Sequence, residues 1–395
     1  MTPDFLIVGA GIFGISAALE LRKRKHSVAV LNPDTIPHPL AASTDISKVI
    51  RMEYGSDTEY MDMAIESIHR WKGYNEQFDD TLYHEVGYVL TSRDRLESPE
   101  QIYEKASYDN LMKRGFKPER LSSGALSKRF PAFADNIYHD GFFHGLAGYC
   151  ESGRAVEVLT DYASSIGVQI IQGEEVIHIL HSNSLAEGVR TKNGNRYEAG
   201  HVIVCAGNST PYLVPDLMPY MKITGHPVFH IKPSQPELFQ EPNFVVFAAD
   251  IANSGWYGFP LHPRKGVVKV ANHGKGLELN PLTDERVVHP SDESNLRKFL
   301  KESIPSLAND PIVYTRRCCY TDTLDGHFWI DHHPAIKGLS IASGGSGHGF
   351  KMGPVVGEMV ADLVTKGDHK WLARHRWRNL RPNTIQMEEA RFHEG

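Results

Sequence analysis

The sequence predicts an α/β fold of the doubly wound type, with a second domain inserted into a nucleotide-binding domain. An apolar strand runs from Asp4 directly into Gly9-x-Gly11-x-x-Gly14, a helical stretch follows over 15–24, and a second apolar strand spans 27–31. Gly9 allows the tight turn, Gly11 lets the backbone approach a pyrophosphate, and Gly14 lets the helix pack on the strand. The helix N-terminus would then face the anion. These features predict dinucleotide binding, and a glycine-tight turn without a ligand is the alternative.

Asn32 follows the second strand, where such folds carry a ribose-binding acid. Its amide can still hydrogen-bond a ribose hydroxyl, but without the charge assistance of a carboxylate. Asp34 comes two residues too late to replace it. We therefore expect Asn32 to bind the ribose.

Length and charge limit the classes of function. A chain of 395 residues suggests two or three domains, and we expect two. The 42 basic and 48 acidic residues leave no excess of positive charge, so we do not expect nucleic acid as a partner. The early apolar run is interrupted by three glycines, which argues against a signal peptide or a membrane span. Four cysteines make no disulfide framework, so we expect a reducing, cytoplasmic location.

The remaining elements follow from periodicity and turn residues. Helices are expected over 57–77, 99–114, 125–130, 154–166 and 354–364. Strands are expected over 83–91, 141–149, 168–172, 175–180, 197–205 and 339–343, with 222–320 rich in strands. Asn193-Gly194 predicts a hairpin turn. Because pieces of the nucleotide domain lie at both ends and in the middle of the chain, the second domain must be inserted between them.

Two blocks near the C-terminus are the most distinctive motifs. One is Cys318-Cys319-Tyr320-Thr321-Asp322-Thr323, with Asp325, His327, Phe328, Ile330, Asp331 and Pro334 after it, and the other is Gly344-Gly345-Ser346-Gly347-His348-Gly349-Phe350-Lys351. With them, nearly the whole chain resembles the flavin-dependent amine oxidases that include monomeric sarcosine oxidase, pipecolate oxidase, saccharopine oxidase and the fructosyl amino acid oxidases. We expect a Rossmann-type FAD-binding domain of residues 1–80, 150–220 and 321–395, and a mixed-sheet substrate domain of 81–149 and 221–320.

Cys318 is the first cysteine of the first block. The resemblance implies that its sulfur is joined to the 8α-methyl of the flavin. A thiolate is the nucleophile that such a bond needs, and Arg316 and Arg317 would favour it electrostatically. A buried, inert cysteine or a vicinal disulfide with Cys319 are the alternatives.

The second block lies between a predicted strand and a predicted helix. Its backbone N–H groups would face the flavin pyrimidine, where negative charge accumulates on reduction, and Lys351 would add a full charge. The resemblance implies that this segment also helps to bind a substrate carboxylate, with His348 beside the reacting centre. The alternative for His348 is an orienting histidine that only shapes the loop.

A third matching region is Tyr257-Gly258-Phe259-Pro260, followed by residues 268–274. Lys269 aligns with the family lysine that contacts the flavin N5 region through water and promotes oxygen reduction, a step in which a cation stabilises superoxide. A solvated surface lysine is the alternative. Tyr257 and His273 are expected to line the pocket.

Lys48 and Arg51 occupy a loop that carries two arginines near the substrate in sarcosine-type members. Arg51 matches directly, whereas Lys48 resembles the lysine of the fructosyl amino acid branch and lacks the bidentate fork of arginine. The resemblance implies that Arg51 and Lys351, with Lys48 as a further candidate, hold a carboxylate. A surface charge is the alternative for Lys48.

The expected site can be given in full. Catalytic roles are expected for Lys269, His348, His273 and Tyr257, and substrate binding for Lys48, Arg51, Tyr257 and Lys351. FAD contacts are expected from Gly9, Gly11, Ile12, Phe13, Gly14, Asn32, Ser43, Lys48, Val176, Ala206, Gly207, Cys318, Gly345, Gly347, His348, Gly349 and Lys351. No metal site is expected, because adjacent histidines such as those of Asp331-His332-His333 point in different directions and no second ligand group is spaced around them.

These residues and the resemblance imply an FAD-dependent oxidase of secondary amines, with N-substituted amino acids as substrates. Hydride would pass from the carbon next to nitrogen to flavin N5, the imine would hydrolyse, and dioxygen would become hydrogen peroxide. A fructosyl amino acid oxidase is the alternative within the class; a flavin dehydrogenase with another acceptor and a non-catalytic flavoprotein are alternatives outside it. The expected partners are a small-molecule amine and dioxygen, with no membrane; the oligomeric state is open and a monomer fits.

Overall fold

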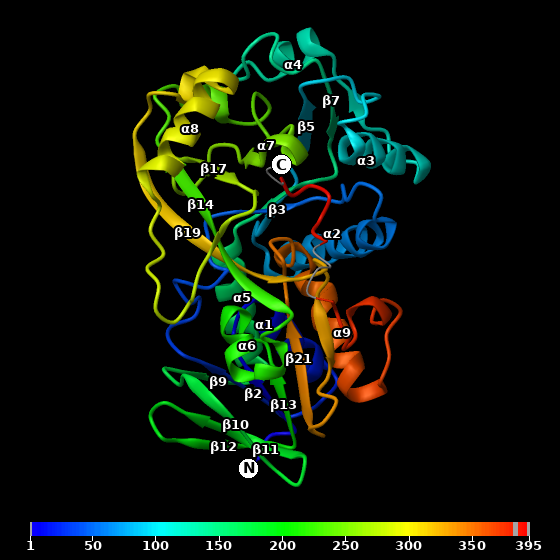
Figure 1. Cartoon of the computed structure of the whole chain (residues 1–395), viewed down its shortest axis with the longest axis vertical. Coiled ribbons are helices and arrows are strands. Elements are labelled where there is room, and N and C mark those ends of the chain that lie inside the picture. The colour runs from blue at the N-terminus through cyan, green and yellow to red at the C-terminus, as the bar shows by residue number, and fades with distance from the viewer. Residues whose placement is uncertain (1, 382–385, 393–395) are drawn as a thin grey trace.

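A computed structural model describes residues 2–381 and 386–392 (Figure 1). Its first sheet has six strands in the order β20-β21-β13-β1-β2-β9. All neighbours are parallel except β20 and β21, which are antiparallel. The strands are β1 (Phe5–Val8), β2 (Val28–Asn32), β9 (Gln169–Gln172), β13 (His201–Val204), β20 (Trp329–His332) and β21 (Leu339–Ser343). This sheet confirms the predicted α/β class.

The two faces of this sheet belong to different cores. One face packs with three helices, α1 (Ile12–Lys23), α5 (Ser152–Ser165) and α9 (Gly353–Lys366). The other face packs against a small antiparallel sheet of β10 (Val176–Ser182), β11 (Leu185–Thr191) and β12 (Arg196–Glu198). The predicted Asn193-Gly194 turn joins β11 to β12.

Glycines set the close packing at the start of the chain. Gly9 has a φ of +103°, and a Cβ on Gly14 would lie 1.9 Å from the carbonyl oxygen of Gly9. A Cβ on Gly357 in α9 would lie 2.6 Å from Ser16 in α1. The strand, turn and helix that were predicted from the glycine spacing therefore form as expected, and α9 packs directly against α1.

A nine-stranded mixed sheet forms the upper part of the molecule in Figure 1. Its strand order is β18-β14-β17-β16-β15-β5-β7-β6, and β19 also pairs with β14. The long antiparallel pair β14 and β19 reaches from this sheet toward the six-stranded sheet (Figure 1). The strands are β5 (Tyr88–Ser92), β6 (Glu119–Arg120), β7 (Asp140–His144), β14 (Met221–Ile231), β15 (Val246–Ala249), β16 (Trp256–Gly258), β17 (Val268–Asn272), β18 (Leu277–Glu278) and β19 (Ile312–Thr323).

The other elements connect or cover these sheets. A three-stranded sheet consists of β3 (Lys48–Ile50), β4 (Tyr83–His84) and β8 (Gly148–Cys150). The remaining α-helices of the described residues are α2 (Thr58–Phe78), α3 (Ile102–Lys113), α4 (Ser123–Arg129), α6 (Thr210–Leu213), α7 (Ile251–Ser254) and α8 (Pro290–Ser303). Helix α2 positions the second glycine-rich block, because the buried indole N–H of Trp71 donates to the carbonyl of Lys351 over 2.9 Å.

Four expectations about local structure were wrong. Residues 290–303 form α8 in a region expected to be rich in strands: Pro290 starts the helix, and the backbone N–H of His289 donates to the Asp292 carboxylate over 2.8 Å. The single strands expected over 83–91, 141–149 and 197–205 are each divided between two sheets: the first into β4 and β5, the second into β7 and β8, and the third into β12 and β13.

The division into two domains stays a prediction. Every strand of the six-stranded sheet lies in the segments assigned to FAD binding, and the nine-stranded sheet draws on 81–149 and 221–320 apart from the last residues of β19. Across the described part of the chain, none of the helices combines the length and the apolar character needed to cross a bilayer.

Candidate functional site

A cavity of about 570 Å³ opens where β1, β13 and β21 end. Ligands of doubly wound sheets bind at the carboxyl ends of the strands, and this volume suits a large cofactor. Of the residues expected to contact FAD, the ones that line this cavity are Gly9, Gly11, Ile12, Phe13, Asn32, Ser43, Lys48, Val176, Ala206, Gly207, Gly345, Gly347, His348, Gly349 and Lys351.

The N-terminus of α1 opens into this cavity through Gly11, Ile12 and Phe13. The first turn holds no acidic side chain, so the positive end of the helix dipole is available to an anion. Gly14 does not line the cavity; it permits the close helix packing described above. The residues present therefore fit a dinucleotide whose pyrophosphate lies at the α1 N-terminus.

Asn32 lines the cavity, but its amide is already engaged. Oδ1 accepts from the backbone N–H of Ala10 over 3.2 Å, and Nδ2 donates to the carbonyls of Asp34 and Thr35 over 2.8 and 3.0 Å. Both amide hydrogens are used, so Asn32 can meet a ribose only as an acceptor, through the second lone pair of Oδ1. Its evident role is to hold the loop after β2.

Cys318 is buried and does not line the cavity itself. Its Sγ lies 3.6 Å from Nζ of Lys48, which does line the cavity. The arginines beside it point to other partners: Arg316 donates to the carbonyl of Ala41 over 3.2 Å, and Arg317 to that of Val287 over 2.6 Å. The cation in contact with the thiol is therefore Lys48 and not either arginine, and Cys318 and Cys319 are both free cysteines.

Lys269 is buried, which rules out the surface-lysine alternative. Its Nζ donates to Oδ2 of Asp45 over 2.7 Å and to the carbonyl of Ser47 over 2.5 Å. It also lies 4.7 Å from the ring centre of Phe259, a residue of the cavity wall. Burial lowers the pKa of Lys269 to about 8, although Asp45 opposes the shift.

Asp45 lies among basic side chains beside the cavity and was not identified from the sequence. Nζ of Lys48 lies 3.7 Å and Nε2 of His230 3.4 Å from its carboxylate, in addition to Lys269. Burial acts to raise the pKa of Asp45, but Lys269 and the nearby His230 hold it well below the usual range. Asp45 therefore stays charged between two lysines.

His348, Tyr54 and Lys351 form a hydrogen-bonded chain. Nζ of Lys351 donates to the hydroxyl of Tyr54 over 3.0 Å, and that hydroxyl lies 3.1 Å from Nδ1 of His348. Nε2 of His348 lies 3.1 Å from the carbonyl of Gly326, which can only accept, so Nε2 carries the proton and Nδ1 accepts from Tyr54. Burial lowers the pKa of His348 to about 4 and that of Lys351 to about 7. His348 is therefore neutral at pH 7.

A second cavity of about 40 Å³ adjoins the first. The two share wall residues, namely Val49, Tyr257, Tyr320, Gly347, His348 and Lys351. The other residues around the small cavity are Arg51, Tyr88, Phe247, Ile251, His273 and Glu388. Tyr257, His273 and Arg51, all expected at the site, thus meet in a compact, largely aromatic space beside the larger cavity.

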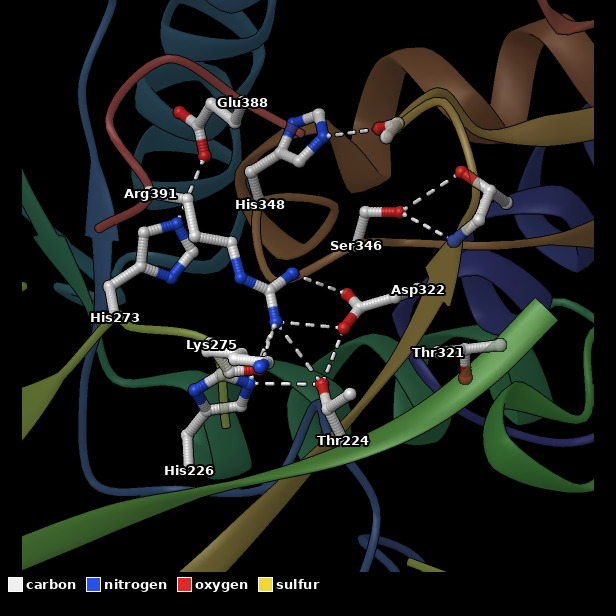
Figure 2. A network of polar contacts seen from close by, with 12 residues as sticks. Thr224, His226, His273, Lys275, Thr321, Asp322, Ser346, His348, Glu388 and Arg391 are labelled. Atoms are coloured by element: carbon white, nitrogen blue, oxygen red, sulfur yellow. Dashed lines mark hydrogen bonds and ion pairs between the residues drawn. The ribbon is translucent and has the colours of Figure 1, made fainter. Parts of the chain in front are cut away.

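Arg51, expected to hold a substrate carboxylate, is already paired with a protein carboxylate. Its guanidinium donates to Glu388, and the two side chains are 5 % and 6 % exposed. Nε2 of His273 lies 3.3 Å from the other oxygen of Glu388 (Figure 2). Burial acts to raise the pKa of Glu388, but Arg51 and the hydrogen bond from His273 hold it well below the usual range. Nothing in the local sequence marks Glu388 as a site residue.

The segment that carries Glu388, residues 386–392, is fixed by Arg391. Figure 2 shows the buried Arg391 guanidinium against Asp322, and both nitrogen–oxygen distances of this fork are 2.8 Å. The same guanidinium donates to Thr224 over 3.2 Å and lies 3.1 Å from Nε2 of His226. A planar bidentate pair of this kind fixes geometry as well as charge, so Glu388 is held in place.

Comparison with known proteins decides the family. Residues 4–363 match the family described as DAO, FAD dependent oxidoreductase. The chain belongs to the DAO family of FAD-dependent oxidoreductases. As a DAO-family flavoenzyme it uses FAD, which agrees with the large cavity at the N-terminus of α1 and confirms the resemblance drawn from the two C-terminal blocks.

Relatives of this DAO-family chain cover almost its whole length. L-saccharopine oxidase of Schizosaccharomyces pombe is 28 % identical, with 96 % of this chain and 94 % of the relative aligned. Monomeric sarcosine oxidase of Bacillus sp. (strain B-0618) is 27 % identical, with 92 % of each chain aligned. The solved structure of fructosyl amine:oxygen oxidoreductase (Amadoriase I) of Aspergillus fumigatus has a TM-score of 0.83 at 23 % identity, covers 100 % of this chain and 94 % of that chain, and shares the fold.

Proposed function

We propose that this flavoenzyme oxidises secondary amines, N-substituted amino acids and their derivatives among them, and passes the electrons to dioxygen. The observation that carries the proposal is the small aromatic cavity, which shares six wall residues with the cavity that fits FAD. Relatives named for the oxidation of saccharopine and sarcosine support the same reaction class. Bound FAD supplies the hydride acceptor for the carbon next to nitrogen and the route of electrons to oxygen, which leaves as hydrogen peroxide.

The aromatic side chains of the small cavity favour the neutral form of an amine, and the negative charge of Glu388 in the same wall is balanced by Arg51. Tyr257, Tyr320 and Phe247 exclude water, and a desolvated amine prefers to lose its proton. His348 is neutral and hydrogen-bonded at both ring nitrogens, so it adds no charge and orients Tyr54. Nζ of Lys351 donates to the hydroxyl of Tyr54, and Lys351 lines both cavities.

Lys269 is proposed to supply the cation for oxygen reduction. The negative charge that develops on oxygen is stabilised best by a buried positive charge that is already in place. Asp45 keeps Lys269 charged at neutral pH despite complete burial, and Lys48 reinforces the positive potential.

Cys318 is proposed to tether the flavin. Support comes from its burial next to the cavity wall and from its contact with Lys48, a residue of that wall, whose Nζ lies 3.6 Å from Sγ. The free, buried state of all four cysteines supports a reducing compartment, and we propose the cytoplasm. A monomeric state stays a prediction.

Steady-state turnover with peroxide detection tests the proposed function. Purified yellow protein is assayed in air with sarcosine, other N-methyl amino acids, pipecolate, saccharopine and fructosyl amino acids. One peroxide released per amine consumed supports the oxidase. Amine consumption with an artificial electron acceptor but without peroxide would replace it by a dehydrogenase, and no consumption under either condition would contradict both.

A further inference from the structure

Glu388 presents a permanent negative charge inside the small cavity. Its carboxylate pairs with Arg51 and lies 3.3 Å from Nε2 of His273, and both partners line the same cavity. The Arg391–Asp322 fork holds the segment in place (Figure 2). The backbone N–H of Gln386 also donates to the carbonyl of Leu324 over 2.8 Å, and that of Phe392 to the carbonyl of His273 over 3.1 Å. The charge is therefore part of the folded pocket.

A second carboxylate would meet this charge at close range. The cavity of about 40 Å³ has room for only a few atoms next to Glu388. Arg51 and Glu388 neutralise each other, so Arg51 brings no net charge to a substrate acid, and Lys351, whose pKa is about 7, also faces this cavity. Two desolvated carboxylates in contact repel strongly, whereas an uncharged group of the same shape is not penalised. The free acid of a substrate is therefore at a disadvantage at this position.

The unused hydrogen-bonding capacity favours a group that both donates and accepts. Among the described residues, Nη1 of Arg51 has no hydrogen-bond partner, although the side chain is buried. The carboxylate of Glu388 has lone pairs beyond those used by Arg51 and His273. A primary amide or a hydroxyl offers an oxygen to Arg51 and a hydrogen to Glu388, but a carboxylate offers acceptors only.

We propose that Glu388 makes this pocket selective for secondary amines whose second polar group is uncharged, as in an amide or an alcohol, over the corresponding free acids. This inference rests on the proposed function and narrows its substrate class. Glu388 acts as a specificity residue, because its carboxylate already pairs with the guanidinium of Arg51 that would otherwise bind the carboxylate of a substrate.

The test uses matched ligands that cannot be oxidised as amines, 2-furamide and 2-furoate. Their affinities for the flavin-loaded protein are measured by titration of the flavin absorbance and by calorimetry. Glu388→Gln keeps the shape and removes the charge. Glu389→Gln is the control, because Glu389 is the neighbouring carboxylate, accepts from the backbone N–H of Ser56 over 2.9 Å, and lies outside both cavities.

We expect the unaltered protein to bind furamide about tenfold or more tightly than furoate, Glu388→Gln to reverse this order, and Glu389→Gln to keep it. The ratio of kcat/KM for sarcosinamide and sarcosine should change in the same direction. Equal affinity of the unaltered protein for furamide and furoate would overturn the proposal, and this outcome needs no variant. An unchanged ratio of the two affinities in Glu388→Gln would also overturn it. If the furamide preference is found but no amine reduces the flavin, the selectivity of Glu388 stands and the proposed amine oxidation fails.

Discussion

Nζ of Lys269 lies 2.7 Å from Oδ2 of Asp45, and each side chain is only 1 % exposed. A buried ion pair of this kind costs desolvation and leaves an uncompensated charge if one partner is removed. The carboxylate that keeps the proposed oxygen-activating lysine charged is thus itself covered by protein, behind the wall of the cofactor cavity.

Replacement of Asp45 should move the pH dependence of flavin reoxidation. With Lys269 at a pKa of about 8, the oxygen reaction should be fastest below pH 8 and slow as the lysine loses its proton above it. Asp45→Asn removes an opposite charge in contact, which is worth about 1–3 pKa units, so the slowing should begin at correspondingly lower pH. Stopped-flow reoxidation across pH 5 to 10 measures it, and a profile unchanged from that of the exposed control Asp62→Asn would contradict the role of Asp45.

Lys351 should titrate near neutrality. Burial and the nearby Arg51 lower its pKa to about 7, so it gains its proton as the pH falls through this value. The binding of 2-furamide, which does not itself titrate there, should strengthen as the pH falls toward 7 and level off below it, because an ammonium donates more strongly than an amine. Lys351→Met should remove this inflection. The same inflection in the variant would assign it to another group.

Cys318 should hold the flavin covalently. Acid precipitation of the purified protein should leave yellow colour in the pellet, and Cys318→Ser should release it to the supernatant. Cys319→Ser is the matched control, since Cys319 is the adjacent buried cysteine and should leave the tether intact. Free flavin from the unaltered protein would contradict the tether without affecting FAD binding.

Asn32→Asp should destabilise the protein without tightening FAD. The carboxylate cannot donate to the carbonyls of Asp34 and Thr35, which now accept from Nδ2. Losing two partly buried hydrogen bonds costs about 0.5–1.5 kcal/mol each, which urea denaturation would detect as a lower free energy of unfolding. Tighter retention of FAD by the variant at unchanged stability would instead indicate that the side chain at position 32 binds the ribose directly.

The N-terminal turn could be predicted because its determinants are local. Gly9, Gly11 and Gly14 lie within six residues, and each answers a steric need of the same strand, turn and helix. The second glycine-rich block was identified for a similar reason. Helix α8 was missed because Pro290 suggests a break, whereas it occupies the first turn of the helix, where its missing N–H costs nothing.

The ion pairs at the centre of the site could not be predicted from the local sequence. Arg51 and Glu388 are 337 positions apart, and Lys269 and Asp45 are 224 apart. A carboxylate in a polar segment has the appearance of a surface residue until the fold shows what surrounds it. The lysines and arginines were found through resemblance, but the acids that set their charge required the structure.

Anaerobic mixing of the yellow protein with the panel of secondary amines, followed by admission of oxygen, tests the central claim most directly. We expect one or more amines to bleach the flavin absorbance rapidly and oxygen to restore it with one hydrogen peroxide per flavin. No bleaching by any amine, in protein that retains its flavin, would contradict the proposed amine oxidation. If oxygen reoxidises the flavin of Lys269→Met as fast as that of the unaltered protein, the role given to the buried lysine is contradicted.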